Sequence, residues 1–343
     1  MLNPPTYPHF EDAYLAVLEH ITSGHRYRNS PRGNASRECL GLSFQLIDPR
    51  QRLVYLPARQ VNPIFHYAEA LWYLTGRSDL EMISYYAPRM RRDSRDGTTI
   101  VGSAYGHRMF TPDDEGASPF DRVLRLLRTE PDSKRGVLPI FQSGELAIPS
   151  NPDVSCAVAL QLLAREGELH MVCYMRANDC DRGLLADVFS FTLLQEFAAI
   201  QLRLKLGMYI HHIGSAHLGE RDLPRVEQIL AQAHATDPPA GSRPARPMPA
   251  DTDFHTLGDL SRLEEALRHD ETRLSAEQAA SLDLPAYWQQ VALLFEIKRQ
   301  LVHRPGLPVD YGVLAALDPG LSVLVGRRWP KRMPESFVLK LQR

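Results

Sequence analysis

The sequence predicts a soluble α/β or α+β fold, in which a mixed sheet is covered by helices and a helical extension lies toward the C-terminal side. Strand-like apolar runs alternate with helical patterns through about the first 220 residues, an order typical of these fold classes. The 343 residues are 44% hydrophobic and 23% charged, enough for a large buried core. No window approaches the roughly 18 uninterrupted apolar residues of a membrane helix.

Charge and cysteine content narrow the function classes. Lys and Arg total 39 against 41 Asp and Glu, so a broad basic surface for nucleic acid is not expected. This charge balance is compatible with local binding sites for small anions. The four cysteines are scattered and form no CxxC pair, which argues against a disulfide framework and a zinc site, and no metal is expected. The first residues lack the basic and apolar regions of a signal peptide, which predicts a cytoplasmic protein.

The first third of the chain is expected to place two helices around a pair of strands. Apolar residues recur at helical spacing over 10–21, and a mixture of Arg, Asn, Ser and Gly predicts a loop over 25–38. Apolar runs predict strands over 40–47 and 52–56, joined by a turn. Helical periodicity returns at Pro63, a favoured first helical residue, and Gly76 ends the helix.

The middle of the chain alternates between the two periodicities. A helix over 120–127 is followed by the breaker PDSKRG and a strand over 136–141. Two strands over 156–164 and 169–175 flank the turn REGE. A long helix over 188–206 and a strand over 208–217 are expected next.

The composition changes abruptly over 233–254, where five prolines predict a stiff linker or exposed loop. Helical patterns follow over 260–267 and 287–302. We therefore expect a catalytic core over 1–232 and a helical C-terminal extension over 255–343 that packs on this core.

Cys156 stands at the start of an apolar run, either as a small buried side chain or as a nucleophile. A nucleophilic thiol needs cationic neighbours, and the candidates are Lys134, Arg135 and Arg176. These three residues form either a solvated charge cluster or a phosphate site, which would indicate a phosphorylated substrate.

Two carboxylates lie among apolar residues of predicted helices, where an unpaired charge is costly. Glu69 belongs to the apolar face of the helix that begins at Pro63, and Asp187 lies within GLLADVFSF. Each is either a site residue or a helix cap or exposed edge. His217, in HHIGSAH, is either a site residue or a satisfied strand histidine.

Taken in order, these segments resemble the thymidylate synthase superfamily. The matching strings are ALWYLTG with Glu69, SAYG with Tyr105, PDSKRG, the segment of Cys156, YMRAND, GLLADVF and GSAH. Synthases carry ELLWFLQG, PVYG, PDSRR, Pro-Cys-His, YQRSxD, GLPFN and GDxHxY in the same order. Seven motifs in register over about residues 60–220 are specific, and they imply the family's mixed sheet covered by helices.

The residue that decides the substrate is Asp187, which falls where synthases have Asn. An Asn amide pairs with both the N3–H donor and the O4 acceptor of uracil. A carboxylate cannot donate to O4, but it accepts from the 4-amino group of cytosine and from a protonated N3. Asp187 therefore favours a cytosine base. YMRAND also resembles the MRSND motif of the phage deoxycytidylate hydroxymethylase, which has Asp at this place.

The resemblance implies a folate-dependent hydroxymethylation. Cys156 would attack C6 of the pyrimidine, and 5,10-methylenetetrahydrofolate would serve as cosubstrate. Glu69 would act as general acid/base and order a water molecule, Tyr105 would assist proton removal at C5, and Asp179 would contact folate with Gly183 nearby.

The resemblance also assigns the nucleotide contacts and a homodimer. Arg176 would bind phosphate together with Lys134 and Arg135 from the other subunit. A further Arg is expected from the early loop, with Arg32 as our choice and Arg28 and Arg37 as alternatives. His217 would contact the ribose.

Several positions depart from the family pattern. Ala157 replaces the His after the nucleophile, Ala177 replaces a Ser, Lys134 replaces an Arg, and Gly219 stands in place of a Tyr. The changes at Ala177 and Gly219 remove bulk and hydroxyls near the sugar, which favours CMP over dCMP. Such a chain is similar to the CMP hydroxymethylases of nucleoside-antibiotic pathways.

Four other functions are weighed against CMP 5-hydroxymethylation. The first two are a dCMP hydroxymethylase and a divergent thymidylate synthase acting on dUMP. A non-catalytic nucleotide-binding relative would not need Cys156, Glu69 and Tyr105 together. RNA binding through the arginines of 25–37 would need a basic surface, which the net charge of −2 does not support.

Overall fold

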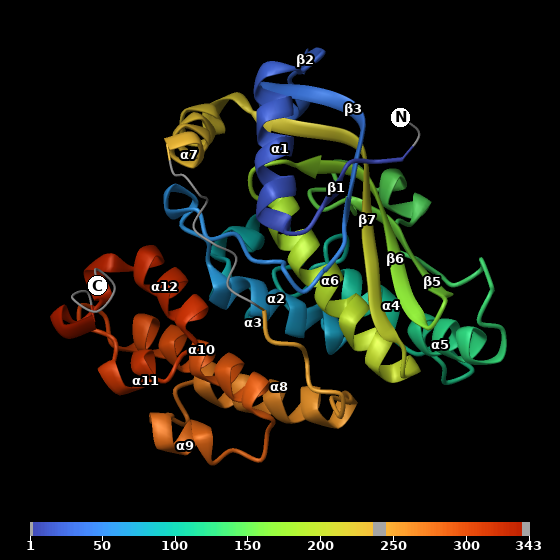
Figure 1. Cartoon of the computed structure of the whole chain (residues 1–343). Coiled ribbons are helices and arrows are strands. Elements are labelled where there is room, and N and C mark those ends of the chain that lie inside the picture. Colours follow the sequence, from blue (N-terminus) through green and yellow to red (C-terminus); the bar gives the residue numbers. More distant parts are fainter. Residues whose placement is uncertain (1–2, 236–244, 338–343) are drawn as a thin grey trace.

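A computed structural model describes residues 3–235 and 245–337 of the chain (Figure 1). Within this part, seven strands form one sheet with the order β1-β3-β7-β6-β5-β4, and β2 pairs with β3. The strands are β1 (Thr6–Tyr7), β2 (Tyr27–Asn29), β3 (Ser36–Leu46), β4 (Val137–Pro139), β5 (Ala157–Arg165), β6 (Glu168–Asp179) and β7 (Lys205–Gly219).

The sheet is mixed, as expected. β1 with β3 and β6 with β7 are parallel pairs, whereas β3 with β7, β5 with β6 and β4 with β5 are antiparallel. The β6–β7 register places Ala177 opposite Ser215 and Asp179 opposite His217. The carboxyl ends of these two long strands therefore bring four polar or small residues to one place, and the candidate site is built there.

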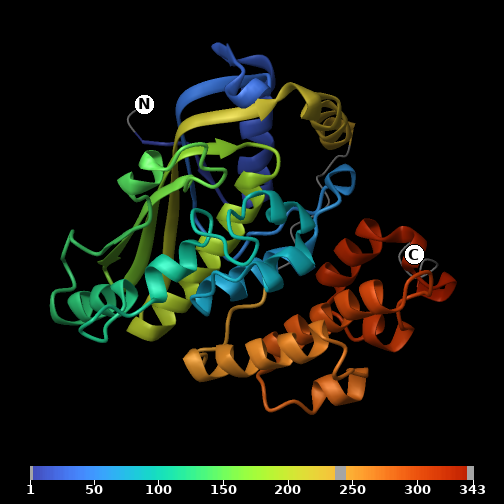
Figure 2. The same ribbon diagram turned by 180° about the vertical axis from the view of Figure 1, so that it is seen from behind.

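The helices cover one face of the sheet. The described helices are α1 (Phe10–Ser23), α2 (Pro63–Leu74), α3 (Leu80–Tyr86), α4 (Tyr105–Phe110), α5 (Pro119–Thr129), α6 (Gly183–Leu202), α7 (Leu223–Ala235), α8 (Phe254–Arg268), α9 (Ala276–Ala280), α10 (Ala286–His303), α11 (Tyr311–Ala315) and α12 (Pro319–Arg328). Helices α1 and α6 lie on the sheet itself, and its other face has no helix over it among the described residues (Figures 1 and 2).

Helix α6 lies at the centre of the core between the sheet and α2. Among the described residues it is the one helix that is long and apolar enough to cross a membrane, and 83% of its apolar window is buried inside the protein. Such burial is typical of the core helix of a globular enzyme.

Helices α8–α12 gather beside α2 and α3, away from the sheet (Figure 2). Helix α10 packs on α2, and α8 packs on both α10 and α3. Glu264 of α8 accepts a 2.8 Å hydrogen bond from the Tyr86 hydroxyl of α3 and pairs with Arg268 at 3.1 Å. Apolar packing and this buried polar contact attach the last helices to the rest of the chain.

Most expected elements are present, but three expectations were wrong. No strand forms over 52–56, because both edges of β3 already pair with β1, β2 and β7; the N–H of Tyr55 is taken instead by the Glu11 carboxylate. The loop over 25–38 contains β2 and the start of β3. Helix α6 covers Gly183–Leu202 rather than 188–206, since Arg203 adopts a left-handed conformation that ends it.

The proline-rich segment is only partly described. Residues 233–235 continue α7, whereas 245–249 have no regular structure. The expected linker over 236–244 lies outside the described residues.

Candidate active site

A pocket of about 730 Å³ opens at the carboxyl ends of β6 and β7. Seven of the residues singled out from the sequence line it, and they come from four separate segments: Arg32, Cys156, Arg176, Ala177, Asp179, His217 and Gly219. We call it the nucleotide pocket.

Cys156 directly precedes β5 and is partly exposed to the nucleotide pocket. Nη2 of Arg176 lies 3.7 Å from its Sγ, and the same guanidinium donates to the carbonyls of Ser155 and Val154 over 2.7 and 2.9 Å. Burial raises the pKa of the Cys156 thiol to about 11, while Arg176 acts in the opposite direction. Cys156 is thus a thiol at neutral pH, and further cations are required to form the thiolate.

Tyr105 begins α4 and is 4% exposed. Its ring stacks on Tyr73 of α2 at 5.4 Å, and a Cβ on the adjacent Gly106 would lie 2.1 Å from the Tyr73 carbonyl oxygen. Glycine is therefore required for α4 to approach α2 this closely. Burial raises the pKa of Tyr105 well above 10, although the backbone amides of Ala157 and Cys156 at its hydroxyl oppose this shift.

Glu69 is buried in α2 and accepts a 3.3 Å hydrogen bond from the Ser190 hydroxyl of α6. Burial first, and then the charge of Asp187, raise the pKa of Glu69 to about 8, against the opposing effect of Arg89. A carboxyl group with this pKa exchanges protons near neutral pH, as a general acid/base must.

Asp187 is held in place by a chain of hydrogen bonds that runs from Tyr209 through His211 and Asn178. The Asn178 amide donates to Oδ2 of Asp187 over 2.7 Å, and Oδ1 of Asn178 is 2.9 Å from Nε2 of His211. Nδ1 of His211 lies 2.7 Å from the Tyr209 hydroxyl. Burial lowers the pKa of His211 to about 3, so it is neutral, and raises the pKa of Asp187 to about 7.

Asp179 ends β6, and Gly183 begins α6 four residues later. Oδ1 of Asp179 accepts from the backbone amides of Asp181 and Arg182 over 2.9 and 3.1 Å. A Cβ at Gly183 would lie 3.1 Å from the Asn178 amide nitrogen. Gly183 therefore makes room for the side chain that orients Asp187.

Glu69, Tyr105, Gly183 and Asp187 are not among the residues that line the nucleotide pocket, and the remaining candidates lie outside it as well. Lys134 and Arg135 are exposed before β4, and Arg135 pairs with Glu130. Arg28 contacts His25, whereas Arg37 donates to the Thr22 carbonyl and pairs with Glu220. Of the three arginines considered in the early loop, Arg32 is the one that lines the pocket.

A second, basic pocket of about 480 Å³ was not found from the sequence. Five arginines line it: Arg59, Arg89, Arg182, Arg225 and Arg328. Among the described residues, Asp181 and Asp222 form ion pairs with three of them, and no carboxylate pairs with Arg89 or Arg328. The cluster thus carries an excess of positive charge, which favours an anionic ligand.

Residues of the basic pocket neighbour Asp179, which lines the nucleotide pocket, and Glu69, which does not. Arg182, whose amide binds Asp179, lines the basic pocket, as does His66, one helical turn before Glu69. The His66 Nδ1 is buried and has no hydrogen-bond partner among the described residues. Arg182 therefore connects the basic pocket with Asp179 of the nucleotide pocket.

Sequence analysis also missed Glu38 and Ser215. The Ser215 hydroxyl donates to the Glu38 carboxylate, and both residues line the nucleotide pocket beside Ala177 and His217. A single carboxylate on a strand gives no local signal of such a position.

Two curated phage proteins are similar to this chain in sequence. The chain is 31% identical over 183 residues to a deoxyuridylate hydroxymethyltransferase of Pseudomonas phage M6, which covers 53% of this chain and 51% of that protein. It is 29% identical over 199 residues to the deoxyuridylate hydroxymethyltransferase of Bacillus phage SP01, which covers 55% of this chain and 52% of that protein. The chain thus spans about half the length of these curated relatives.

The fold agrees with a solved structure. Thermostable thymidylate synthase A from Bacillus subtilis superposes with a TM-score of 0.54 and 20% identity, covering 65% of this chain and 84% of that one. The profile of the thymidylate synthase family matches residues 12–246, which is more than half of the chain. With the fold, the motif order and this match in agreement, the chain belongs to the thymidylate synthase family.

Proposed function

We propose that the protein is a CMP 5-hydroxymethylase, which converts CMP, 5,10-methylenetetrahydrofolate and water to 5-hydroxymethyl-CMP and tetrahydrofolate. The observation that carries the proposal is the carboxylate of Asp187, which is oriented by a hydrogen bond from Asn178. By the family resemblance, this is the position of the Asn whose amide recognises the base in synthases. The names of the two relatives support hydroxymethyl transfer to a pyrimidine nucleotide.

The environment of Asp187 suits cytosine. Oδ2 accepts from Asn178, and within residues 3–235 and 245–337 no hydrogen bond reaches Oδ1, which leaves it for the 4-amino group. The pKa of Asp187, raised by burial to about 7, lets the carboxyl share a proton with N3 of cytosine near neutral pH.

Three residues perform the chemistry in this proposal. Cys156 adds to C6, which makes C5 nucleophilic. Tyr105, whose hydroxyl faces the Cys156 and Ala157 amides, assists removal of the C5 proton. Glu69, with a pKa near 8, exchanges that proton and orders the water that supplies the new hydroxyl.

The residues present fit the folate cosubstrate, which supplies the one-carbon unit. In this proposal Asp179, whose carboxylate accepts from the Arg182 amide, holds the folate ring, and Gly183 leaves space beside it. The arginines of the basic pocket provide charge-assisted hydrogen bonds to glutamyl carboxylates. Among the described residues, no group of three or more His, Cys, Asp or Glu is placed to hold a metal ion.

Phosphate binding and dimer formation are linked in this proposal. Arg176 and Arg32 of one chain line the nucleotide pocket, and Lys134 and Arg135 reach it from the second chain. The sheet face without helices supports a homodimer, since Tyr174 and Met208 are 39% and 36% exposed on it. The Gln161 side chain links the Lys134 carbonyl at 2.8 Å to the Tyr174 hydroxyl at 3.1 Å, so Lys134 borders this face.

A ribonucleotide is favoured by the sugar side of the nucleotide pocket. Ala177 offers a methyl group where the family has a hydroxyl, and Glu38 adds an acceptor on the same wall. His217, the cross-strand neighbour of Glu38, contacts the ribose in this proposal.

Deoxyuridylate is the second candidate substrate, because both relatives are named for it. A dCMP hydroxymethylase and a dUMP-methylating synthase remain as alternatives that the same assay separates. We also infer that residues 1–232 form the catalytic core of a cytoplasmic enzyme, with residues 255–343 packed on it. The contact of α10 with α2 supports this division.

The test is incubation with methylenetetrahydrofolate labelled in its one-carbon unit and, separately, CMP, dCMP, UMP and dUMP. We expect the label in 5-hydroxymethyl-CMP, with no rise in dihydrofolate absorbance. Label in dUMP but in neither cytidylate would overturn the assignment, and dihydrofolate formation would indicate a synthase. Cys156→Ala should bind CMP without turnover, which separates an enzyme from a nucleotide-binding protein.

A further inference from the structure

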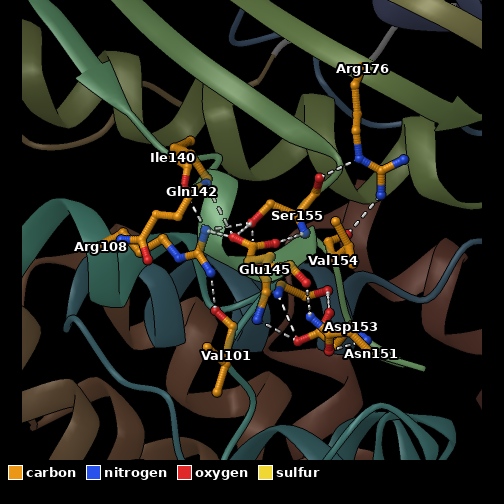
Figure 3. A network of polar contacts seen from close by, with 12 residues as sticks. Val101, Arg108, Ile140, Gln142, Glu145, Asn151, Asp153, Val154, Ser155 and Arg176 are labelled. Carbon is orange, nitrogen blue, oxygen red and sulfur yellow. Dashed lines mark hydrogen bonds and ion pairs between the residues drawn. The ribbon is translucent and has the colours of Figure 1, made fainter. Parts of the chain in front are cut away.

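One buried ion pair ties the segment before Cys156 to three other segments, and the chemistry proposed above does not use it. Arg108 of α4 and Glu145 of the short 3₁₀ turn η4 (Ser143–Ala147) contact each other, and their side chains are 6% and 4% exposed (Figure 3). Burying both charges is unfavourable unless their hydrogen-bonding groups are satisfied.

Arg108 is satisfied by backbone from two loops. Its Nη2 donates to the Val101 carbonyl over 2.7 Å, and Nη1 reaches the Ile140 carbonyl. Nη1 also lies 2.6 Å from the Ser155 hydroxyl, which donates to the Gly102 carbonyl over 2.7 Å. A single guanidinium thus joins the loop before α4, the end of β4 and the residue before the nucleophile.

Glu145 holds the backbone of that same residue. Its Oε2 accepts the Ser155 N–H over 2.6 Å, while the Ser155 carbonyl accepts from Nε of Arg176 over 2.7 Å. Burial alone would raise the pKa of Glu145, but the Ser155 amide and Arg108 lower it below its ordinary value, so the carboxylate is charged. Ser155 is consequently held from both sides, by an anion at its N–H and by a cation at its carbonyl (Figure 3).

Asp153 attaches the same loop a second time. Oδ2 of Asp153 accepts the amides of Gly102 and Ser103 over 2.6 and 3.0 Å. A Cβ on Gly102 would lie 2.0 Å from the Asp153 carbonyl oxygen, so only glycine permits this approach. The nucleophile loop therefore rests on the loop that leads to Tyr105.

We propose that Arg108 and Glu145 are positioning residues, which fix the Ser155–Cys156 peptide so that the Cys156 thiol stays against the Arg176 guanidinium. Arg176 contacts both the Ser155 carbonyl and Sγ of Cys156, so a shift of Ser155 moves the cation away from the sulfur. The role of Cys156 as nucleophile rests on the proposed function, whereas its contact with Arg176 does not.

The test compares Glu145→Gln with Glu196→Gln, a matched control in a second buried ion pair. Arg52 and Glu196 lie 2.6 Å apart, are 5% and 6% exposed, and do not line the nucleotide pocket. Both variants should lose thermal stability to a similar degree, and Ser155→Ala, which keeps the N–H, should keep most of the nucleophile's reactivity.

The first measurement is the rate at which iodoacetamide alkylates Cys156 at pH 8, followed by mass spectrometry. We expect Glu145→Gln to react about fivefold more slowly than the wild type, and Glu196→Gln to match the wild type. Removing a negative charge or loosening the loop would alone speed alkylation, so an equal or faster rate in Glu145→Gln would overturn the proposal. This measurement requires no substrate.

The second measurement is deuterium exchange at C5 of CMP and UMP without folate, which reports addition of Cys156 to C6. Glu145→Gln should lower the exchange rate at least tenfold and leave nucleotide affinity within twofold. Exchange of neither nucleotide by the wild type would contradict the proposed function alone. Normal exchange in Glu145→Gln beside an active wild type would contradict the positioning role alone.

Discussion

The Asn178 side-chain amide donates a 2.7 Å hydrogen bond to Oδ2 of Asp187 and so determines which carboxylate oxygen is left for the substrate. The carboxylate accepts from the Asn178 NH2 group, so the Asn178 oxygen faces His211 and accepts from its Nε2. Nδ1 of His211 then accepts from the Tyr209 hydroxyl. The orientation of Asp187 is therefore set by residues of β6 and β7 that do not line the nucleotide pocket.

The kcat/KM for CMP should fall as pH rises through about 7, the pKa of Asp187. The ionised carboxyl still accepts from the 4-amino group, but it no longer supplies the proton that is shared with N3 of cytosine. Steady-state kcat/KM for CMP and UMP between pH 6 and 8.5 tests this expectation. Asp187→Asn should favour uridylate at every pH; an unchanged base preference would contradict the role of Asp187.

Ala177→Ser should lower the ratio of kcat/KM for CMP to that for dCMP. The added hydroxyl occupies space on the pocket wall at β6, where the 2'-hydroxyl is proposed to lie. We expect a change of about tenfold, which corresponds to ~1.4 kcal/mol. Ala177→Gly keeps the space and should retain the CMP preference; a higher CMP preference in Ala177→Ser would refute the argument about the sugar.

Glu69→Gln should be more stable than the wild type at pH 8 while losing turnover. The pKa of Glu69 is about 8 in the folded protein against an ordinary value of 4.5. The folded state therefore retains a proton that the unfolded state releases, so stability falls as pH rises from about 4.5 to 8. Denaturant unfolding at pH 5 and 8 should show a gain on the order of a few kcal/mol at pH 8 only. An equal difference at both pH values would contradict this pKa.

Arg328→Gln should weaken binding of a polyglutamyl folate more than that of the monoglutamate. Arg328 comes from α12, lines the basic pocket and has no carboxylate partner among the residues of the described ranges. We expect KM for the polyglutamate to rise about fivefold, the size of a lost charge-assisted contact at a partly exposed site. Lys331→Gln removes an exposed charge three residues away and should leave both KM values unchanged.

The sequence predicted those helices and strands whose ends are marked by nearby turn or cap residues. The turn REGE between two apolar runs gave the β5–β6 hairpin, and Pro63 with Gly76 bounded α2. The strand expected over 52–56 failed because propensity does not tell whether a sheet edge is free to pair. The sequence predicted a start of α6 that is too late, because the local pattern does not show that the Asp179 side chain accepts hydrogen bonds from the amides of Asp181 and Arg182, directly before the helix.

The site was predictable where a motif held it together and not where distant segments meet. Cys156, Arg176 and His217, which belong to the motifs, line one pocket with Arg32, whereas the motif residues Glu69, Tyr105 and Asp187 do not line it. The basic pocket draws arginines from positions 59, 89, 182, 225 and 328, and no local pattern relates residues so far apart. Asn178 was visible within YMRAND, but its role depends on a hydrogen bond across to α6.

The electrostatic influence of Asp187 on Glu69 couples recognition to catalysis. The charge of Asp187 helps to raise the pKa of Glu69, so the charge that a bound base leaves on the first carboxyl changes how readily the second gives up its proton. A base that draws the proton of Asp187 toward itself leaves Asp187 negatively charged, which raises the pKa of Glu69. A base that keeps Asp187 neutral lowers the pKa of Glu69 by comparison. Selectivity can therefore arise after binding, because an ill-matched nucleotide meets a general acid/base in the wrong protonation state.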